Sequence, residues 1–184
     1  MIKRIVARWE DWSGNGREHL VLKEGPSGIV AESVILADLD GQAIALRYRV
    51  ACDSAWRVNK AEIICIGDER PVELESDGVG NWVDSAAIAQ PQLRGAIDID
   101  ISATPFTNTL PIRRLDLRLG ESAEILVVYV RIPDLAILTD RQRYTRLGEL
   151  RYRYDSVDSD FTREIEMDEL GLVTTYPGLF RRVL

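Results

Sequence analysis

Hydrophobic and polar residues alternate along much of the chain. From Ile44 to Cys52 every second residue is apolar, and the residues between them are alanine or arginine. The same period of two runs through residues 97–101, 115–119 and 150–154. Such alternation predicts β-strands that place one face against a core and leave the other face partly charged.

Two further runs, residues 63–66 and 125–130, are apolar throughout and predict strands that are covered on both faces. Turn-forming pairs such as Asp40-Gly41 separate the runs. Many short strands at this spacing predict an all-β fold in which a curved antiparallel sheet forms an open or closed barrel. Helical periodicity is scarce, and we expect at most short helical turns near residues 82–88 and 140–144.

The length of 184 residues predicts a single β-rich domain over residues 1–184. An internal sequence similarity suggests how that domain arose, because residues 46–50 resemble residues 150–154. Each of these strands is followed by a polar stretch, another strand and an acidic turn with glycine. The pattern is typical of a duplicated meander with halves at about 1–92 and 93–184, although two strands of common composition also resemble each other by chance.

The charge balance limits the classes of partner. With 23 basic and 30 acidic residues the formal net charge is −7, which argues against nucleic acid or an anionic membrane surface as the main partner. Only three of the basic residues, at positions 3, 23 and 60, are lysines. Arginine presents a planar fork that suits carboxylates, phosphates and aromatic faces, but a GC-rich genome would produce the same bias.

Cysteine and histidine are too few for several kinds of site. Cys52 and Cys65 are the only cysteines, whereas a small secreted domain is usually cross-linked by more. The N-terminus lacks a signal-peptide core, and no apolar run approaches the roughly 20 residues of a membrane span. We therefore expect a cytoplasmic protein that does not span a membrane. Because His19 is the only histidine and no phosphate or dinucleotide loop is present, we expect no metal and no cofactor.

A polar segment, residues 104–111, lies between two alternating runs. Pro105 and Pro111 restrict the backbone on both sides, so we expect a rigid loop. Its threonines and its asparagine offer hydroxyl and amide groups either to the loop's own backbone or to a ligand. Two aspartates precede the segment and two arginines follow it. Such a loop could grip a polyhydroxylated or phosphorylated headgroup.

The stretch from Asp98 to Leu115 resembles the signature of a bacterial family of glycolipid-binding proteins. Other segments fit the same pattern, namely Trp9 with Gly16–Glu18, Cys52–Arg57, Asp77–Trp82, Gln142–Tyr144, Asp168–Val173 and Tyr176-Pro177. The resemblance covers essentially the whole chain. It implies a β-rich, barrel-like fold and a glycolipid or lipid-like ligand, and it identifies no catalytic residues.

We therefore hypothesise that the protein binds a glycolipid or a similar small amphipathic ligand on a polar-lined concave face of the sheet. Aromatic rings can stack on a sugar while their polar edges stay hydrated. If these faces point outward instead, the same residues form only a salt-bridged surface. The residues expected to contact the polar part are Asp98, Asp100, Thr107, Asn108, Arg113 and Arg114, and those expected beside the rings or the chain are Trp56, Trp82 and Tyr144. Arg57 is a further expected ligand-binding residue.

Two other classes of function stay open. A carboxylate-dependent hydrolase of a sugar or lipid headgroup would use Asp98 or Asp100, together with an acid such as Asp53, as its acid and base. A protein-interaction module would use the apolar and basic tail, residues 176–184, which otherwise covers an exposed sheet edge. Because neighbouring arginines explain the aspartates as ion-pair partners, we favour a binding protein over an enzyme.

Overall fold

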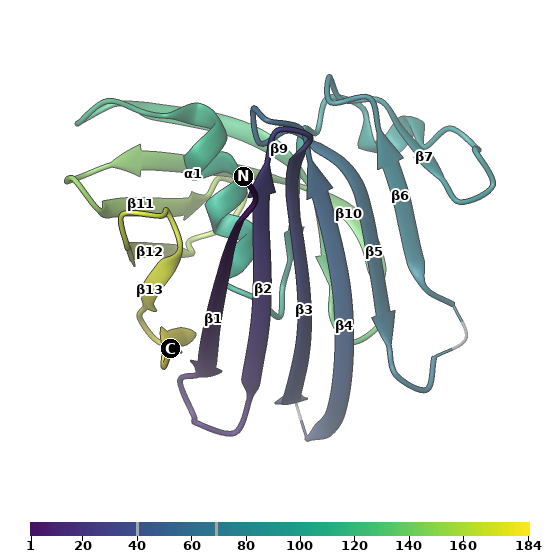
Figure 1. Ribbon diagram of the computed structural model, residues 1–184, viewed down its shortest axis with the longest axis horizontal. Coiled ribbons are helices and arrows are strands. Elements are labelled where there is room, and N and C mark those ends of the chain that lie inside the picture. The colour runs from purple at the N-terminus through teal and green to yellow at the C-terminus, as the bar shows by residue number, and fades with distance from the viewer. Residues whose placement is uncertain (40, 69) are drawn as a thin grey trace.

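The computed structural model describes residues 1–39, 41–68 and 70–184. The expected turn at Asp40-Gly41 therefore lies partly outside the described residues. The first half of the chain folds into an antiparallel meander of seven strands (Figure 1). These strands are β1 (Lys3–Asp11), β2 (Arg17–Gly25), β3 (Gly28–Leu39), β4 (Gln42–Cys52), β5 (Val58–Cys65), β6 (Val72–Ser76) and β7 (Trp82–Asp84).

The second half adds seven more strands to the same sheet. They are β8 (Asp98–Ile101), β9 (Ser122–Arg131), β10 (Ala136–Arg146), β11 (Arg151–Ser156), β12 (Thr162–Met167), β13 (Val173–Tyr176) and β14 (Phe180–Arg182). Pairing of β1 with β14 joins the two meanders, so the C-terminal tail is used within the sheet. The sheet ends at β7 and β8 and is not closed. The predicted curved, barrel-like antiparallel sheet is thus confirmed, except that β8 runs parallel to β9. The internal duplication stays a prediction.

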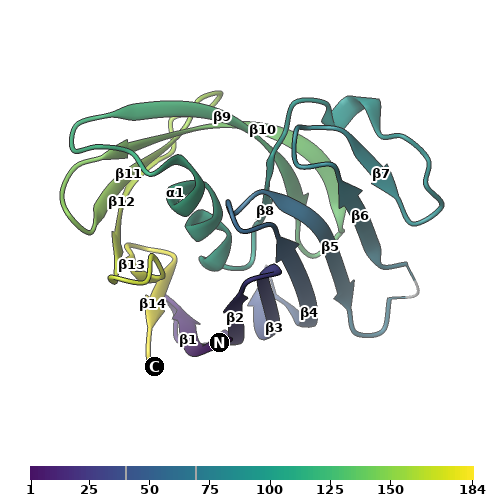
Figure 2. The ribbon, with the colours of Figure 1, turned by 45° about the horizontal axis from the view of Figure 1, so that its top comes forward.

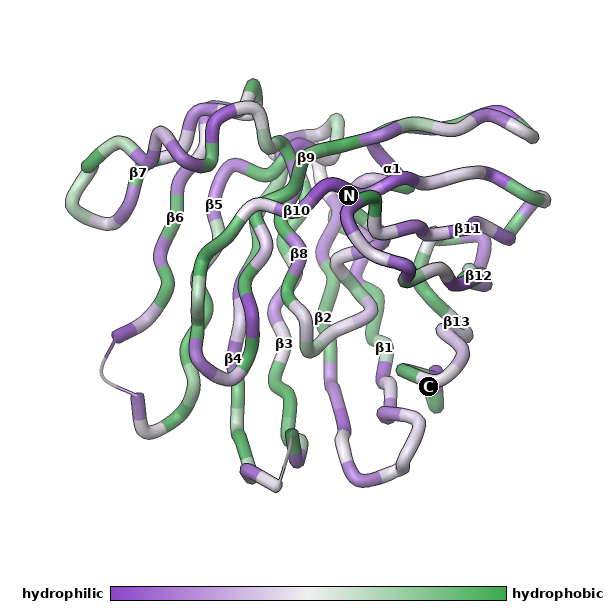
Figure 3. Tube along the Cα trace, turned by 180° about the vertical axis from the view of Figure 1, so that it is seen from behind, coloured by the Kyte–Doolittle hydropathy of each residue, from purple (hydrophilic) through white to green (hydrophobic). Residues whose placement is uncertain are grey.

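The alternating runs mark strands whose two faces differ, as expected. In β4 the side chains of Leu46, Tyr48 and Val50 are buried, whereas Arg47 between them is exposed. Figure 3 shows the resulting alternation of hydrophobic and hydrophilic residues along the strands of the first meander. Because apolar side chains recur every second residue, each strand turns its apolar face inward.

One prediction about the polar segment was wrong, because residues 104–111 are not a loop. They form a 3-10 turn, η2 (Phe106–Asn108), that continues into α1 (Thr109–Leu115). Pro111 is tolerated in the first turn of this helix, where a backbone N–H has no intrahelical acceptor. Phe106 and Leu110 are fully buried. Figure 2 shows α1 inside the curve of the sheet, so this segment lies on the concave side.

Three further predictions were wrong. Residues 115–119 alternate without forming a strand, because Leu115 ends α1 and Asp116 adopts a left-handed backbone with φ of 44°. Residues 82–84 form β7, and residues 140–144 lie within β10, so neither is helical. A short 3-10 turn, η1 (Pro91–Leu93), was not expected. Among the described residues, no helix is long and apolar enough to cross a membrane.

The interior has two hydrophobic clusters. The larger one lies under the first meander and includes Phe106 and Leu110 of the central segment, which is the stretch of residues 104–115. The smaller one lies under the second meander and is rich in tyrosine. Trp9 connects the two halves, because its buried indole nitrogen donates a hydrogen bond of 2.7 Å to the carbonyl oxygen of Val173. A buried N–H without such an acceptor would be costly, so this contact helps to fix the two meanders against each other.

Candidate functional site

Two adjoining clefts open on the concave side of the sheet. The first, the acidic cleft, has a volume of about 460 Å³ and is lined by residues that include Asp100, Asn108, Tyr129, Asp140, Tyr154 and Tyr176. The second, the apolar cleft, has a volume of about 300 Å³ and is lined by residues that include Trp9, Trp12, Ile35, Ala37 and Leu39. Ser102, Leu179 and Phe180 line both clefts, so a single elongated ligand could occupy the two together.

A hydrogen-bonded group of side chains forms the floor of the acidic cleft. Asp100 projects from β8 and accepts a hydrogen bond of 2.8 Å from the Thr107 hydroxyl. The side-chain amide of Gln142, on β10, donates to Asp100 at 2.7 Å and to Asp140 at 3.1 Å. Burial raises the pKa of Asp100, although the bonds from Thr107 and Gln142 favour its charged form. The Gln142 amide thus holds two carboxyl groups beside the same cavity.

Asn108 is held in place from behind the cleft. The hydroxyl of the fully buried Tyr144 donates to its Oδ1 at 2.9 Å, and its own Nδ2 donates to the Pro105 carbonyl at 3.2 Å. These contacts fix the amide of Asn108 against the cleft wall. Tyr144 therefore positions a lining residue and does not itself line the cleft.

Aromatic rings form much of the acidic cleft's wall. The Tyr154 ring packs edge-on against Phe161 at 5.9 Å between centroids and lies 6.4 Å from Tyr176, which in turn contacts Phe180 at 6.4 Å. Burial, followed by the charge of Asp100, raises the pKa of both Tyr154 and Tyr176. Both phenols therefore stay protonated at neutral pH and can donate hydrogen bonds.

A buried carboxyl group, Glu18, lies at the back of the apolar cleft. It accepts hydrogen bonds from three hydroxyls, those of Ser33 at 2.7 Å, Tyr48 at 2.6 Å and Thr104 at 2.7 Å. Only 4% of Glu18 is exposed, and burial raises its pKa to about 7, although the hydrogen bonds from the three hydroxyls lower it. The carboxyl group therefore ties β2, β3 and β4 to the start of the central segment.

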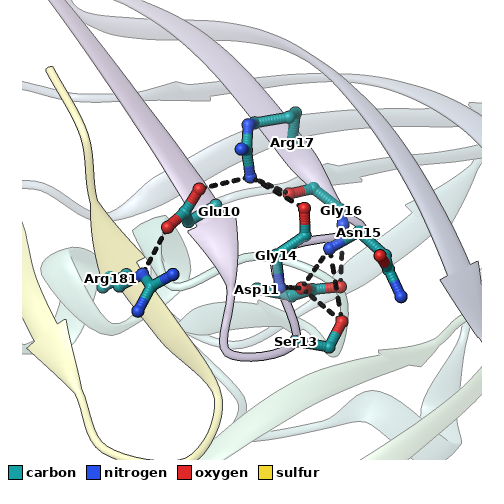
Figure 4. A network of polar contacts seen from close by, with 8 residues as sticks. All are labelled: Glu10, Asp11, Ser13, Gly14, Asn15, Gly16, Arg17 and Arg181. Carbon is teal, nitrogen blue, oxygen red and sulfur yellow. Dashed lines mark hydrogen bonds and ion pairs between the residues drawn. The ribbon is translucent and has the colours of Figure 1, made fainter.

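The mouth of the apolar cleft carries a charged network around Glu10 (Figure 4). Glu10 lies between Arg17, at 2.5 Å, and Arg181, with which it also forms an ion pair. Next to it, Asp11 accepts hydrogen bonds from the backbone of the hairpin turn, including Gly14 and Gly16. Burial alone would raise the pKa of Asp11, but these bonds and one from the Ser13 hydroxyl lower it. The network fixes the β1–β2 turn that carries Trp12.

A third cleft, the arginine cleft, has a volume of about 510 Å³ and is lined by residues that include Trp56, Arg113, Arg114, Arg146 and Tyr152. Its arginines are held by protein groups. Arg114 donates hydrogen bonds to the fully buried Asp98 from two nitrogens, Nε at 3.0 Å and Nη2 at 2.5 Å. Burial raises the pKa of Asp98, and the guanidinium of Arg114 opposes that shift. Arg113 lies 4.8 Å over the Trp56 ring and donates to the Leu170 carbonyl at 2.8 Å.

The structure distributes the ten residues singled out from the sequence over several places. Asp100 and Asn108 line the acidic cleft, and Thr107 and Tyr144 support them. Trp56, Arg113 and Arg114 line the arginine cleft, with Asp98 behind Arg114. Trp82 is buried and donates from its indole to the Ala96 carbonyl at 2.7 Å. Arg57 is exposed, and it follows a turn stabilised by Asp53, whose carboxylate accepts from the backbone N–H groups of Ala55 and Arg57.

Sequence reasoning missed several residues of the two adjoining clefts. The clearest are Glu18, Asp140 and Gln142, none of which was a candidate. The alternation of faces along each strand indicates that all three point inward. Glu18 lies on the same face of β2 as Leu20, and Asp140 and Gln142 lie on the same face of β10 as Tyr144. A polar residue in phase with the apolar face of a strand points inward, and this was the signal to follow.

The described residues offer little for metal chemistry. They contain no group of three or more histidine, cysteine, aspartate or glutamate side chains that could hold a metal ion. Cys52 is buried and Cys65 half-buried, and both are free thiols. The side chains that line the clefts offer carboxylates, hydroxyls, amides, aromatic rings and, in the apolar and arginine clefts, guanidinium groups.

With this geometry in place, comparison with known proteins gives a family. The model of a family described as "Putative glycolipid-binding" matches residues 6–182. The chain belongs to this family. It is also similar to a crystal structure of a DUF1089 family protein from Pseudomonas aeruginosa, with 37% sequence identity, a TM-score of 0.84 and coverage of 92% of each chain. Among curated proteins, none matches the chain.

Proposed function

We propose that the protein binds one amphipathic ligand, a glycolipid or a similar molecule, with its headgroup in the acidic cleft and its chain in the apolar cleft. The observation that carries the proposal is that the two clefts differ in chemistry yet share Ser102, Leu179 and Phe180. A ligand that extends across these residues would meet polar groups at one end and Ile35, Ala37 and Leu39 at the other.

The lining of the acidic cleft suits a sugar. Carboxylates and amides such as Asp100 and Asn108 can accept from and donate to hydroxyl groups. The rings of Tyr154 and Tyr176 offer flat apolar faces on which a sugar ring can stack. The description of the family, which names glycolipid binding, agrees with this assignment.

Several residues expected at the ligand have other roles in this proposal. Asp98 and Arg114 satisfy each other inside the protein, and the ring of Trp56 is covered by Arg113. Trp82 packs in the core, where its indole has a backbone acceptor. We therefore assign the headgroup to Asp100 and Asn108, with Thr107 and Tyr144 as positioning residues, and treat the others as structural.

The test is native mass spectrometry of the purified protein, followed by denaturing extraction and lipid analysis. We expect a bound amphipathic species that is lost on unfolding. Ala37→Trp, which fills the apolar cleft, should abolish this species. Ala43→Trp, at an exposed position of β4, is the matched control and should retain it. An unliganded mass that persists after incubation with a bacterial lipid extract would contradict the proposal.

A hydrolase acting on a sugar is the second candidate. The supporting observation is that Asp100 and Asp140 both accept from the Gln142 amide, so their carboxyl groups lie no farther apart than glycosidase acid pairs, which are separated by about 5 to 9.5 Å. The raised pKa of Asp100 is what a general acid requires. Turnover of nitrophenyl glycosides that disappears in Asp100→Asn and in Asp140→Asn would favour this candidate. Binding without turnover would favour the first proposal.

A further inference from the structure

The acidic cleft has a one-sided charge. Among the described residues that line it there is no lysine, arginine or histidine, whereas Asp100 and Asp140 both face it. Neither aspartate forms an ion pair with another described residue. The nearest basic side chains along β10, Arg141 and Arg143, point to the opposite face and pair with Glu124. Strand alternation therefore separates the charges, with acids inside and arginines outside.

Both carboxylates keep acceptor capacity for a ligand. An ionised carboxylate can accept about four hydrogen bonds. Asp100 receives one from Thr107 and one from Gln142, and Asp140 receives one from Gln142 and none from any other described side chain. The cleft thus offers several carboxylate lone pairs to groups that donate hydrogen bonds.

Asn108 adds a separate sign that a ligand completes the cleft. It is 6% exposed and lines the cleft, and its amide nitrogen carries two hydrogens. Within the part of the chain that the structure describes, only one of them is used, in the bond to the Pro105 carbonyl. A buried donor without a partner is unfavourable, so the second hydrogen needs an acceptor such as a hydroxyl oxygen or a ring oxygen of a ligand.

From these observations we infer that the acidic cleft selects a headgroup that is uncharged or carries an amine, and rejects one that carries a phosphate, sulfate or carboxylate group. This inference rests on the proposed function. A neutral sugar donates its hydroxyls to Asp100 and Asp140 and accepts from Asn108. An ammonium group gains the attraction of both aspartates and of the aromatic rings of Tyr154 and Tyr176. An anionic group meets the two aspartates, and Arg163, which lies 4.6 Å over the ring of Phe161, is not among the lining residues that could bind it directly.

The experiment is calorimetric titration with three probes that share one chain and differ in headgroup charge. They are octyl β-D-glucoside, its 2-amino-2-deoxy analogue and octyl β-D-glucuronide, each kept below the concentration at which it forms micelles. We expect the amine and the neutral probe to bind at least about tenfold more tightly than the glucuronide at pH 7 and low salt. Equal or tighter binding of the glucuronide would overturn the inference.

A double variant separates the cleft from the net charge of the chain. In Asp100→Asn with Asp140→Asn we expect the preference against the glucuronide to shrink by about tenfold. The matched control, Glu73→Gln with Asp134→Asn, changes the net charge equally at two exposed positions and should keep the preference. A preference that survives in the cleft variant would also overturn the inference. If none of the three probes binds, the proposed function itself fails, and this result is distinct from binding without discrimination.

Discussion

The acidic cleft and the arginine cleft are lined from the same central segment but use their charged groups differently. At the η2 end, Asp100 and Asp140 face a cavity, and neither forms an ion pair with another described residue. At the α1 end, Arg114 is locked onto a buried aspartate, and Arg113 is held by Trp56 and a backbone carbonyl. Charged groups that the protein already satisfies serve folding, whereas those left open remain available to a ligand. The comparison therefore separates the residues that serve folding from those that we propose to contact a ligand.

The largest expected effect comes from breaking the ion pair of the arginine cleft. Arg114→Leu leaves the fully buried Asp98 without its partner, and we expect a loss of about 3–5 kcal/mol in the free energy of unfolding. Urea denaturation measures the loss. The double variant Asp98→Leu with Arg114→Leu should recover most of it, because no charge then stays buried alone. A loss below about 1 kcal/mol in Arg114→Leu would show that this pair is not structural.

The next effect concerns Glu18, at the back of the apolar cleft. Its pKa of about 7 in the folded protein lies above its ordinary value of 4.5, so the folded chain binds the proton more tightly than the unfolded chain. The free energy of unfolding should therefore fall as the pH rises from about 4.5 to about 7. Glu18→Gln removes this titration and should become more stable than the natural protein by up to about 3 kcal/mol above pH 7.

Denaturation at several pH values tests this expectation. The difference between Glu18→Gln and the natural protein should be small near pH 4.5 and should grow as Glu18 ionises. Glu73→Gln, at an exposed position of β6, serves as the control and should show no such trend. A difference that does not depend on pH would mean that Glu18 does not titrate in this range.

The smallest expected effect on stability is in the acidic cleft. Asp140 lines the cavity and has no ionic partner among the described residues, so Asp140→Asn should change the free energy of unfolding by less than about 0.5 kcal/mol. The same substitution should weaken the binding of an amine-bearing octyl glycoside. Urea denaturation and calorimetry on one preparation measure the two effects. A large loss of stability without a change in binding would assign Asp140 a structural role.

The sequence was sufficient for several of the strands, but not for β7, part of β10 or the central segment. Alternation correctly placed β4 and β11, because one face of each packs on the core. Alternation misassigned residues 115–119, and the two prolines led to the wrong prediction of a loop over residues 104–111. Seven residues of the central segment form α1, whose burial inside the sheet is a tertiary effect. A helix this short has too few turns to show a period of 3.6 in the sequence.

The site was predicted in part for a related reason. The signature around residues 98–115 supplies Asp100 and Asn108, but the opposite wall comes from β10, β11 and β13. No local pattern shows that these strands face the central segment, because that depends on how far the sheet curves. The grouping of Arg114 with the ligand residues likewise assumed proximity, whereas the structure pairs it with Asp98.

The most direct test of the central claim is a titration of the nitrogen-15-labelled protein with octyl β-D-glucoside, observed by two-dimensional NMR. The four tryptophan indoles report on different places: Trp9 and Trp12 line the apolar cleft, Trp56 lines the arginine cleft, and Trp82 is in the core. We predict shifts for the indoles of Trp9 and Trp12 and for the side-chain amides of Asn108 and Gln142, with Trp56 and Trp82 unchanged. Shifts confined to Trp56 and its neighbours would contradict the account.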